Sequence, residues 1–294
     1  MSITERLANL SIPTVIITIV VLFALRYVLL KQKTPIAKSI AEIAESLAVA
    51  MGLVFLIIRP FIVQAFFIPS ESMLPTLQVH DHILVNKFIY RFREPKHGDV
   101  IVFKSPPQAN QDGQEKDFIK RVIAVPGDTV RITPGYVLVD GAQYNHSDLE
   151  SILRGYGKSD GKVSVKLLNG EVLVDGRLVT KSEIAAAAER PNAKVKVVPG
   201  VVYLNGKPLR EPYTAEDPDE PYPGGPRSFV KDEWIVVNKK GEQMVKIPKG
   251  KLLVMGDNRN DSNDARFWGL LDRDRVLGKA MFIFWPPSRI RWVH

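Results

Sequence analysis

The chain has 294 residues, 45% of them hydrophobic and 24% charged, so it can bury a substantial core, and wholesale disorder is excluded. It contains no cysteine, which excludes disulfides, thiolate metal sites and a cysteine nucleophile. The net charge of +8 suits anionic lipid head groups, whereas no compact basic block with interleaved aromatic residues supports nucleic acid as a partner.

Two long apolar runs open the chain. The first, Ile12 to Leu30, has about the 20 residues needed to cross a bilayer. No small-x-small cleavage site follows it, so a retained helix is favoured over a cleaved export signal. The second run, Ser46 to Ile68, contains Arg59 and ends before Pro69. It either spans the bilayer with Arg59 reaching the interface, or ends early with an apolar segment on the membrane surface.

Lysines gather between the two runs, at positions 31, 33 and 38. Short basic loops stay on the cytoplasmic side of a membrane, so the loop 31–45 is expected there. The N-terminus and everything after Pro69 would then face outward. This pattern predicts a two-helix membrane anchor over residues 1–67 and an extracytoplasmic domain over residues 68–294.

The outer domain is predicted to be mainly β, as a barrel or ribbon, because short β-branched runs alternate with Gly/Pro turns. The clearest predicted strands are His82–Val85, Asp99–Phe103, Phe118–Val125, Trp234–Val237, Lys251–Val254 and Ala280–Trp285. Only Ser182–Arg190, with its alanine run, predicts a helix. The proline-rich acidic stretch Glu211–Pro226 predicts an exposed, mobile loop.

A pattern of strand, glycine turn, strand and Asp-Gly or Asn-Gly turn occurs three times. The copies begin near Val130, Val163 and Val195, and each has the same six-residue step between its glycines. Asp-Gly and Asn-Gly are strong hairpin signals. Chance recurrence of hairpins in a β-rich chain is the alternative, but the constant step favours duplication.

Three segments contain candidate catalytic residues: 68–77 around Ser72, 117–128 around Lys120 and 256–266 around Ser262. Judged alone, each has a plain structural explanation as a turn, an exposed strand face or a solvated loop. A calcium loop in the third segment is excluded, since no register places glycine sixth and glutamate twelfth.

Taken together, the three segments resemble type I signal peptidases. The matching runs are Ser-Met-Leu-Pro-Thr-Leu from Ser72, Lys-Arg-Val-Ile-Ala-Val-Pro-Gly-Asp from Lys120 and Gly-Asp-Asn-Arg-x-x-Ser-x-Asp-x-Arg from Gly256. The resemblance extends from about Ile68 to the C-terminus and includes the anchor. It implies a multi-pass plasma (inner) membrane serine endopeptidase with a signal peptidase-like β-fold. Such an enzyme removes N-terminal signal peptides from exported preproteins and needs no cofactor or metal.

The resemblance also implies roles for individual residues. Ser72 would be the nucleophile and Lys120 its general base, with Ser262 orienting the lysine. Ser70 and the Ser72 N–H would form the oxyanion hole. Supporting ion pairs would join Arg121 to Asp257 and Arg266 to Asp264. The expected substrate-binding residues are Phe66, Ile68, Pro69, Met73, Leu77, Ile83, Phe118 and Ile119, which would admit signal peptides with Ala-x-Ala cleavage sites.

Two positions depart from the family pattern. Ala265 replaces the usual serine, and Glu71 stands where glycine is frequent. Neither position is catalytic in the family, so the departures affect local packing and rate rather than mechanism.

The chemistry agrees with this resemblance. A serine hydroxyl needs a base, and none of the five histidines lies in a recognisable triad motif. A lysine serves as base only when neutral, and burial favours that form. Lowering its pKa by about 2 units costs roughly 3 kcal/mol, which the packing must supply. Strand alternation puts Phe118 and Val122 on the Lys120 face, and both are candidate walls for its pocket.

Other readings fit less well. A non-catalytic membrane-tethered β-domain predicts a broken dyad, yet both dyad residues are present. A self-cleaving Ser-Lys peptidase of the kind fused to SOS repressors would have a DNA-binding domain in place of the anchor. Histidine-based signal peptidases of the endoplasmic reticulum are disfavoured by Lys120.

The third hairpin copy best fits the family's own strand pair, because it leads into Arg210-Glu-Pro-Tyr213. Residues 134–198 are therefore interpreted as an insertion made by duplicating that hairpin. We expect it to extend an existing sheet and to leave the strands that hold the dyad undisturbed.

Overall fold

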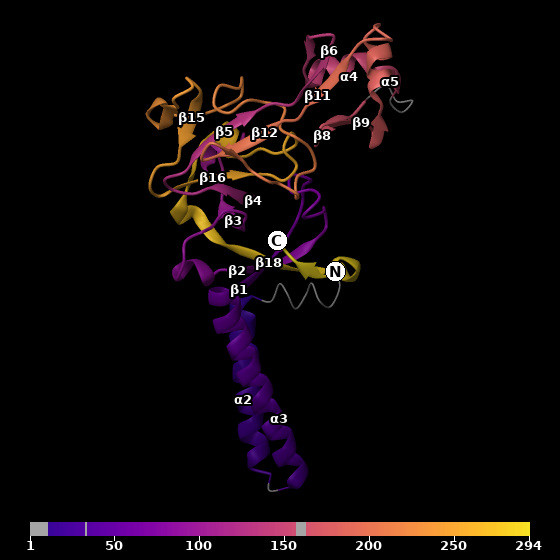
Figure 1. The fold of residues 1–294 in the computed structure, drawn as a ribbon. Helices are drawn as coiled ribbons and strands as arrows, with labels where there is room; N and C mark the ends of the chain where they lie inside the picture. The colour runs from indigo at the N-terminus through magenta and orange to yellow at the C-terminus, as the bar shows by residue number, and fades with distance from the viewer. Residues whose placement is uncertain (1–10, 33, 157–162) are drawn as a thin grey trace.

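The computed structural model describes residues 11–32, 34–156 and 163–294. Over these residues a mainly β body stands on a stalk of two helices, and a smaller lobe lies at the far side of the body (Figure 1). The mainly β fold expected from the sequence is confirmed. The side chains of residues 58–61 lie outside the described part, and the expectation for Arg59 falls there.

The stalk is formed by α2 (Ile12–Leu30) and α3 (Pro35–Gly52), and the π-helical segment η1 (Leu53–Ile62) continues α3. A serine and a threonine cap the starts of α2 and α3, each followed by proline within the first two helical positions. In α3 the alanines at positions 37, 41, 44 and 48 are buried, and this stripe of small residues lets α2 approach closely. An Arg26–Glu45 ion pair of 2.9 Å also joins the two helices.

The second helix begins earlier than the sequence indicated. It starts at Pro35 rather than Ser46, so the connection is residues 31–34 instead of the loop 31–45. Glu42 and Glu45, which precede the apolar run, lie within the helix, because glutamate is a good helix former, and Glu45 is also paired with Arg26. The helical path also ends at Ile62, and the last residues of the predicted anchor form a strand of the body.

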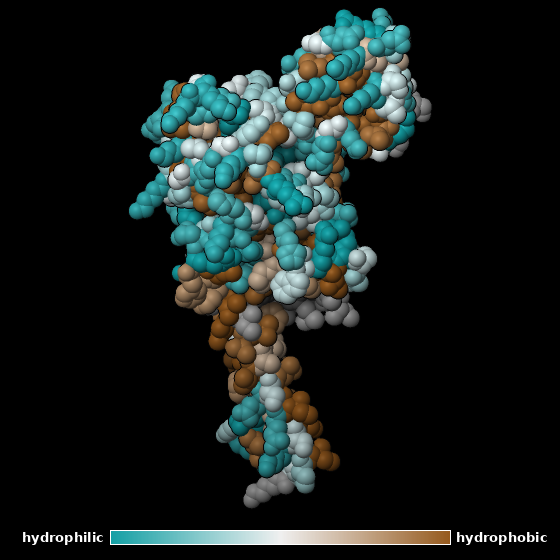
Figure 2. Space-filling view, viewed as in Figure 1, coloured by the Kyte–Doolittle hydropathy of each residue, from teal (hydrophilic) through white to brown (hydrophobic). Residues whose placement is uncertain are grey.

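The stalk has the length and composition of a membrane-spanning pair. Ile12–Leu30 and Pro35–Ile57 have mean hydropathies of 2.3 and 2.1, and most of their surface is exposed. Figure 2 shows apolar side chains over much of the stalk, whereas the body above it is largely hydrophilic. A core helix of a soluble protein would bury such a surface, so lipid is the fitting environment for this one.

The body contains two antiparallel sheets. The larger has the order β1-β2-β18-β3-β4-β16-β17, and β19 pairs with β18. Its strands are β1 (Val63–Phe67), β2 (His82–Asn86), β3 (Val100–Lys104), β4 (Asp117–Ala124), β16 (Lys251–Met255), β17 (Leu271–Asp272), β18 (Val276–Trp285) and β19 (Arg291–Trp292). The smaller has the order β13-β12-β5-β15-β14. Its strands are β5 (Thr129–Thr133), β12 (Val201–Leu204), β13 (Lys207–Pro208), β14 (Ile235–Val237) and β15 (Gln243–Lys246).

The two sheets share one core. Val122 on β4, Ile132 on β5, Val245 on β15 and Leu252 on β16 are all buried in the same apolar cluster. The chain passes from β4 to β5 through a turn that Asp128 closes by accepting the Val125 N–H at 2.8 Å. The body also contains short helical turns. These are α6 (Ala265–Trp268), η2 (Ile89–Arg91), η3 (Pro107–Ala109), η5 (Asp232–Trp234), η6 (Arg273–Arg275) and η7 (Pro287–Arg289).

Residues 134–198 form the separate lobe. It holds two three-stranded sheets, β11-β6-β7 and β10-β9-β8, with two short helices. The elements are β6 (Tyr136–Val139), β7 (Ala142–Tyr144), α4 (His146–Ile152), η4 (Arg154–Tyr156), β8 (Val165–Leu168), β9 (Glu171–Val174), β10 (Arg177–Val179), α5 (Lys181–Ala187) and β11 (Val195–Val198). Every member of its buried core cluster, from Val137 to Val195, belongs to the lobe itself.

The lobe contains two copies of one hairpin-and-helix unit. In each, an Asp-Gly turn with positive φ at both residues joins two strands, β6–β7 or β9–β10. A helix with a complete capping box follows, headed by Asn145 in α4 and by Thr180 in α5. The strand after each helix pairs with the first strand of the other unit, since β8 pairs with β9 and β11 with β6.

This arrangement corrects two expectations. The inserted hairpins do not extend a sheet of the body, because the two lobe sheets, β11-β6-β7 and β10-β9-β8, contain no strand of the body. Consequently β5 pairs with β12, across the insertion, and not with β6. The helix predicted at Ser182–Arg190 is present as α5, whereas α4 was not predicted.

The stretch Glu211–Pro226 is also different from its prediction. Within it Glu216, Asp217 and Tyr222 are buried, and Tyr222 forms a β-bridge with Ile132. Its proline and acidic residues suggested a solvated loop, but residues of the body and the lobe form hydrogen bonds with its carboxylates and backbone. We call residues 211–222 the strap.

Candidate active site

Strand β4 places two cations at the centre of the larger sheet. It lies between β3 and β16, so Lys120 is opposite Ile101 and Arg121 is opposite Met255. Because neighbouring residues of a strand point to opposite faces, the two side chains enter different surroundings. Both are buried, with 5% and 1% of their surface exposed. Burying a cation is costly, so each needs partners or a change of protonation.

The Lys120 side chain contacts Ser72, which lies in the loop after β1. Lys120 Nζ lies 2.8 Å from Ser72 Oγ and donates to the Ile119 carbonyl at 2.9 Å. The Phe118 ring lies 5.5 Å from the same nitrogen, as strand alternation predicts. Burial lowers the pKa of Lys120 to about 8, although Asp264 and Asp257 act to raise it. A useful fraction of the lysine is therefore neutral in mildly alkaline solution.

Ser70 lies beside Ser72, with its Oγ 3.4 Å from Ser72 Oγ. A substrate carbonyl placed at Ser72 Oγ would therefore lie near the Ser70 hydroxyl. Ser72 is 8% exposed, so the site can be reached from solvent. Three of the expected groups, Ser70, Ser72 and Lys120, come together here.

The loop 256–266 follows β16, whose last residue pairs with Arg121. Gly256 is required where this loop packs against Ser72. A Cβ on it would lie 2.3 Å from Ser262 Oγ and 2.4 Å from the Ser72 carbonyl oxygen. Ser262 is therefore packed against the site, and its buried hydroxyl is near enough to Asp264 to help lower the pKa of that carboxyl. No hydrogen bond joins Ser262 to Lys120 in the part of the chain that is described, so its orienting role stays a prediction.

Two buried ion pairs flank this loop. Arg121 donates to both oxygens of Asp257, at 2.8 and 2.7 Å, and Arg266 binds Asp264 at 2.8 Å through each of two nitrogens. Burial opposes the charge of Asp264, yet Arg266 holds the pKa of that carboxyl below its usual value. The Asp264 carboxylate also accepts the Gly256 N–H at 3.0 Å. These pairs fix the loop in one conformation.

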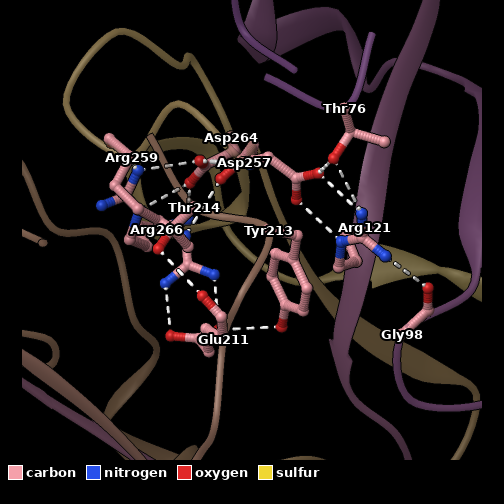
Figure 3. A network of polar contacts seen from close by, with 11 residues as sticks. Thr76, Gly98, Arg121, Glu211, Tyr213, Thr214, Asp257, Arg259, Asp264 and Arg266 are labelled. Carbon is pink, nitrogen blue, oxygen red and sulfur yellow. Dashed lines mark hydrogen bonds and ion pairs between the residues drawn. The ribbon is translucent and has the colours of Figure 1, made fainter. Parts of the chain in front are cut away.

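Two residues that the sequence analysis left unassigned connect the parts of the site. Thr76 donates to Asp257 at 2.5 Å and accepts from Arg121 at 3.2 Å (Figure 3). Asn258 donates its backbone N–H to the Ser72 carbonyl at 3.1 Å and its amide to the Glu71 carbonyl at 3.2 Å. Both lie inside the motifs that carry the family resemblance, and this was the available signal.

The expected substrate-binding residues divide into two groups. Phe66, Pro69, Phe118 and Ile119 keep exposed surface near the dyad. The other four, Ile68, Met73, Leu77 and Ile83, are at most 2% exposed and belong to the apolar core beneath the larger sheet. Their large side chains pack under the loop that carries Ser72, and their part in substrate binding stays a prediction.

Within residues 11–32, 34–156 and 163–294, no three His, Asp or Glu side chains are grouped to hold a metal ion. The arrangement itself can abstract a proton from a serine, stabilise an oxyanion and return the proton to a leaving group. These are the requirements of acyl transfer by a serine hydrolase.

Comparison with known proteins points the same way. The family described as signal peptidase, peptidase S26, matches residues 40–285. Signal peptidase I of Leptolyngbya laminosa is 30% identical, with 88% of this chain and 85% of that protein covered. Signal peptidase I of Aquifex aeolicus is 35% identical, with 83% of each chain covered. A solved signal peptidase I from Enterococcus faecalis, 18% identical, covers 64% of this chain and 97% of that one. Its TM-score of 0.23 is too low to bear on the arrangement of strands.

Proposed function

The chain belongs to the signal peptidase family of serine endopeptidases, and we propose that it removes signal peptides from exported preproteins with a Ser72–Lys120 dyad. The observation that carries the proposal is a buried lysine Nζ 2.8 Å from a serine Oγ, with a pKa lowered by burial. A buried lysine that only filled space would need a carboxylate partner, whereas among the described residues Lys120 Nζ contacts the Ser72 hydroxyl and the Ile119 carbonyl and forms no ion pair.

Each proton can be followed through the reaction. Neutral Lys120 accepts the hydroxyl proton while Ser72 Oγ bonds to the scissile carbonyl carbon. The oxyanion that forms is within reach of the Ser70 hydroxyl and the Ser72 N–H. The Lys120 ammonium then protonates the departing amine, which releases the mature protein and leaves the signal peptide as an ester on Ser72. Water attacks that ester while Lys120 accepts one of its protons. As the ester bond breaks, Lys120 returns that proton to Ser72 Oγ, and the signal peptide leaves as a carboxylic acid that loses its proton to solvent.

The substrate is proposed to bind as an extended segment beside the exposed residues Phe66, Pro69, Phe118 and Ile119. Because Met73 and Ile83 fill the space below, only shallow pockets remain for side chains. Alanine one and three residues before the cut fits such pockets. Peptides with leucine or lysine at those positions should be cleaved much more slowly, and equal rates would contradict this specificity.

The proposed location is the plasma (inner) membrane, with the body on the extracytoplasmic side. The apolar stalk supports the anchor, and the base of the body supports lipid contact. Phe67, Phe88, Phe92 and Trp285 are exposed on and beside β1, β2 and β18, the strands next to the stalk (Figure 1). Aromatic side chains favour the membrane interface. Protease added outside spheroplasts should digest the region after Pro69, whereas digestion of the 31–34 connection instead would invert the topology.

The direct test is cleavage of a signal-bearing preprotein by the detergent-solubilised enzyme. The parent should release the mature protein, and Ser72→Ala should not. Cleavage by the Ser72→Ala protein would show that the activity arises elsewhere.

A further inference from the structure

The strap runs along the loop 256–266 and contacts it at several residues. Its first residue, Glu211, accepts two hydrogen bonds from Arg259, at 2.7 and 2.5 Å. Arg259 is fully buried, and its Nε donates to the Gly256 carbonyl at 3.0 Å. Gly256 is the residue that contacts both Ser72 and Ser262. The Arg259 guanidinium therefore connects Glu211 of the strap to Gly256, which packs against Ser72 and Ser262. Figure 3 shows Arg259 and Glu211 in this network.

The charges in this network depend on one another. Burial opposes the charge of Arg259, but the Glu211 carboxylate more than offsets that effect and holds the pKa of Arg259 above its usual value. Without Glu211, a cation with no exposed surface would lose its only ion-pair partner in the described part of the chain. Leaving a buried charge unpaired is costly, so the loop would have to move until water reached it.

Tyr213 connects the Glu211–Arg259 pair to the Arg121–Asp257 pair. Its hydroxyl donates to Glu211 at 3.0 Å, and its ring lies 3.9 Å from the Arg121 guanidinium carbon. Arg121 in turn is held by Asp257. The strap thus contacts two buried cations, Arg259 through Glu211 and Arg121 through Tyr213 (Figure 3).

Backbone contacts extend the same support along the loop. Ala215 donates its N–H to the Asp257 carbonyl at 3.0 Å. Asn260 donates to the Asp217 carbonyl at 3.0 Å and accepts the Asp219 N–H at 3.0 Å. Asn260 lies two residues before Ser262, so both ends of the segment nearest the dyad are fastened to the strap.

From these contacts we infer that Glu211 is a positioning residue of the reaction, which holds the loop 256–266 against Ser72 and Lys120 through Arg259. The inference rests on the proposed function, because it concerns the base of that reaction. Glu211 touches neither the substrate nor the reacting atoms. Its effect reaches Lys120 through the packing of Gly256 and Ser262, which excludes water from the lysine.

The test compares Glu211→Gln with Glu220→Gln in the full-length, detergent-solubilised enzyme. Glu220 also lies on the strap, but it pairs with the exposed Arg227 and is the matched control. Glu211→Gln should lower kcat/KM about tenfold to a hundredfold, as expected when a catalytic group is misplaced by about 1 Å. Because water would then reach Lys120, the acid limb of its pH profile should move above pH 8. Glu220→Gln should change neither.

A double-mutant cycle separates positioning from general damage. If Glu211 acts through Arg259, the Glu211→Gln/Arg259→Gln protein should be no less active than Arg259→Gln alone. A Glu211→Gln enzyme with the parent's kcat/KM and pH profile would overturn the inference, and so would full additivity of the two losses. A parent enzyme that fails to cleave, or a Ser72→Ala protein that cleaves, would instead overturn the proposed function.

Discussion

The body and the lobe are built on opposite principles. All the buried polar and charged side chains in the described part of the chain lie in the body, among them Lys120, Arg121 and Arg259. Within residues 134–156 and 163–198 the buried side chains are apolar. The body thus gives up stability to hold charges where chemistry needs them, whereas the lobe is packed for stability alone.

The two regions also differ in how far their contacts reach along the chain. The site joins a loop near residue 72, a strand near residue 120 and a loop near residue 260, so it exists only once the whole sheet has formed. The lobe closes on itself within 134–198 and meets the strap through few hydrogen bonds. Asp217 donates its N–H to the Leu167 carbonyl at 2.7 Å and accepts the Asn169 N–H at 3.4 Å. Changes in the body should therefore alter catalysis far more than changes in the lobe.

The largest effect is expected from the base itself. Lys120→Met should lower kcat by about a thousandfold or more, since a serine without its base retains only the catalysis supplied by binding and the oxyanion hole. Lys104→Met is the matched control, because Lys104 lies on the adjacent strand in an exposed pair with Asp117. The rate at which each variant cleaves a signal-bearing preprotein measures the two effects. Equal losses in the two variants would mean that charge on this sheet matters, and not the dyad.

The same substitution should stabilise the fold. Burial lowers the pKa of Lys120 from 10.5 to about 8, so the folded state disfavours the bound proton. That cost is fully present below pH 8, declines as the pH rises toward 10.5 and vanishes above it. Lys120→Met should therefore raise the free energy of unfolding at pH 7 by up to about 3 kcal/mol. Thermal unfolding in detergent checks this, and a stability gain independent of pH would contradict the buried-charge account.

The oxyanion donor comes next. Ser70→Ala should lower kcat about a hundredfold, or roughly 2.7 kcal/mol in the barrier, by removing one aimed hydroxyl. Ser182→Ala in the lobe serves as a control, since that hydroxyl lies on the exposed face of α5. If Ser70→Ala cleaves as fast as the parent, the oxyanion must be stabilised by other donors.

The smallest effect is expected from removing the lobe. Thr133 and Val201 already face each other in the β5–β12 ladder, so replacing residues 134–200 by Asn-Gly would close a two-residue hairpin. Peptide cleavage should stay within tenfold of the parent, a barrier change of at most about 1.4 kcal/mol. A folded but inactive protein would show that the lobe builds part of the site and would break the comparison.

The sequence predicted what local signals encode. The Asp-Gly and Asn-Gly turns predicted the hairpins β6–β7, β9–β10 and β12–β13, and all three are present. It did not predict that β5 would pair with β12, because that pairing skips the whole insertion and has no local signature. The burial of the strap was missed for the same reason, since Arg259, the partner that neutralises Glu211, is distant in sequence.

For the site, the residues alone left each segment with a plain structural explanation. The family resemblance implied the roles of Ser72 and Lys120 and the Arg121–Asp257 and Arg266–Asp264 pairs, and both pairs are present. The need for Gly256 follows only from the approach of Ser72 and Ser262, which no spacing reveals. Likewise, only the packing shows that the side chains of Met73 and Ile83 are fully buried.

The central claim, that neutral Lys120 is the general base, is tested most directly by the pH dependence of kcat/KM on a signal-peptide substrate. The acid limb of that profile reports the pKa of the essential base in the free enzyme. We expect activity to rise through about pH 8, where burial places the pKa of Lys120. An activity that already levels off near pH 7, with an acid limb close to the ordinary histidine pKa of about 6.5, would contradict the assignment.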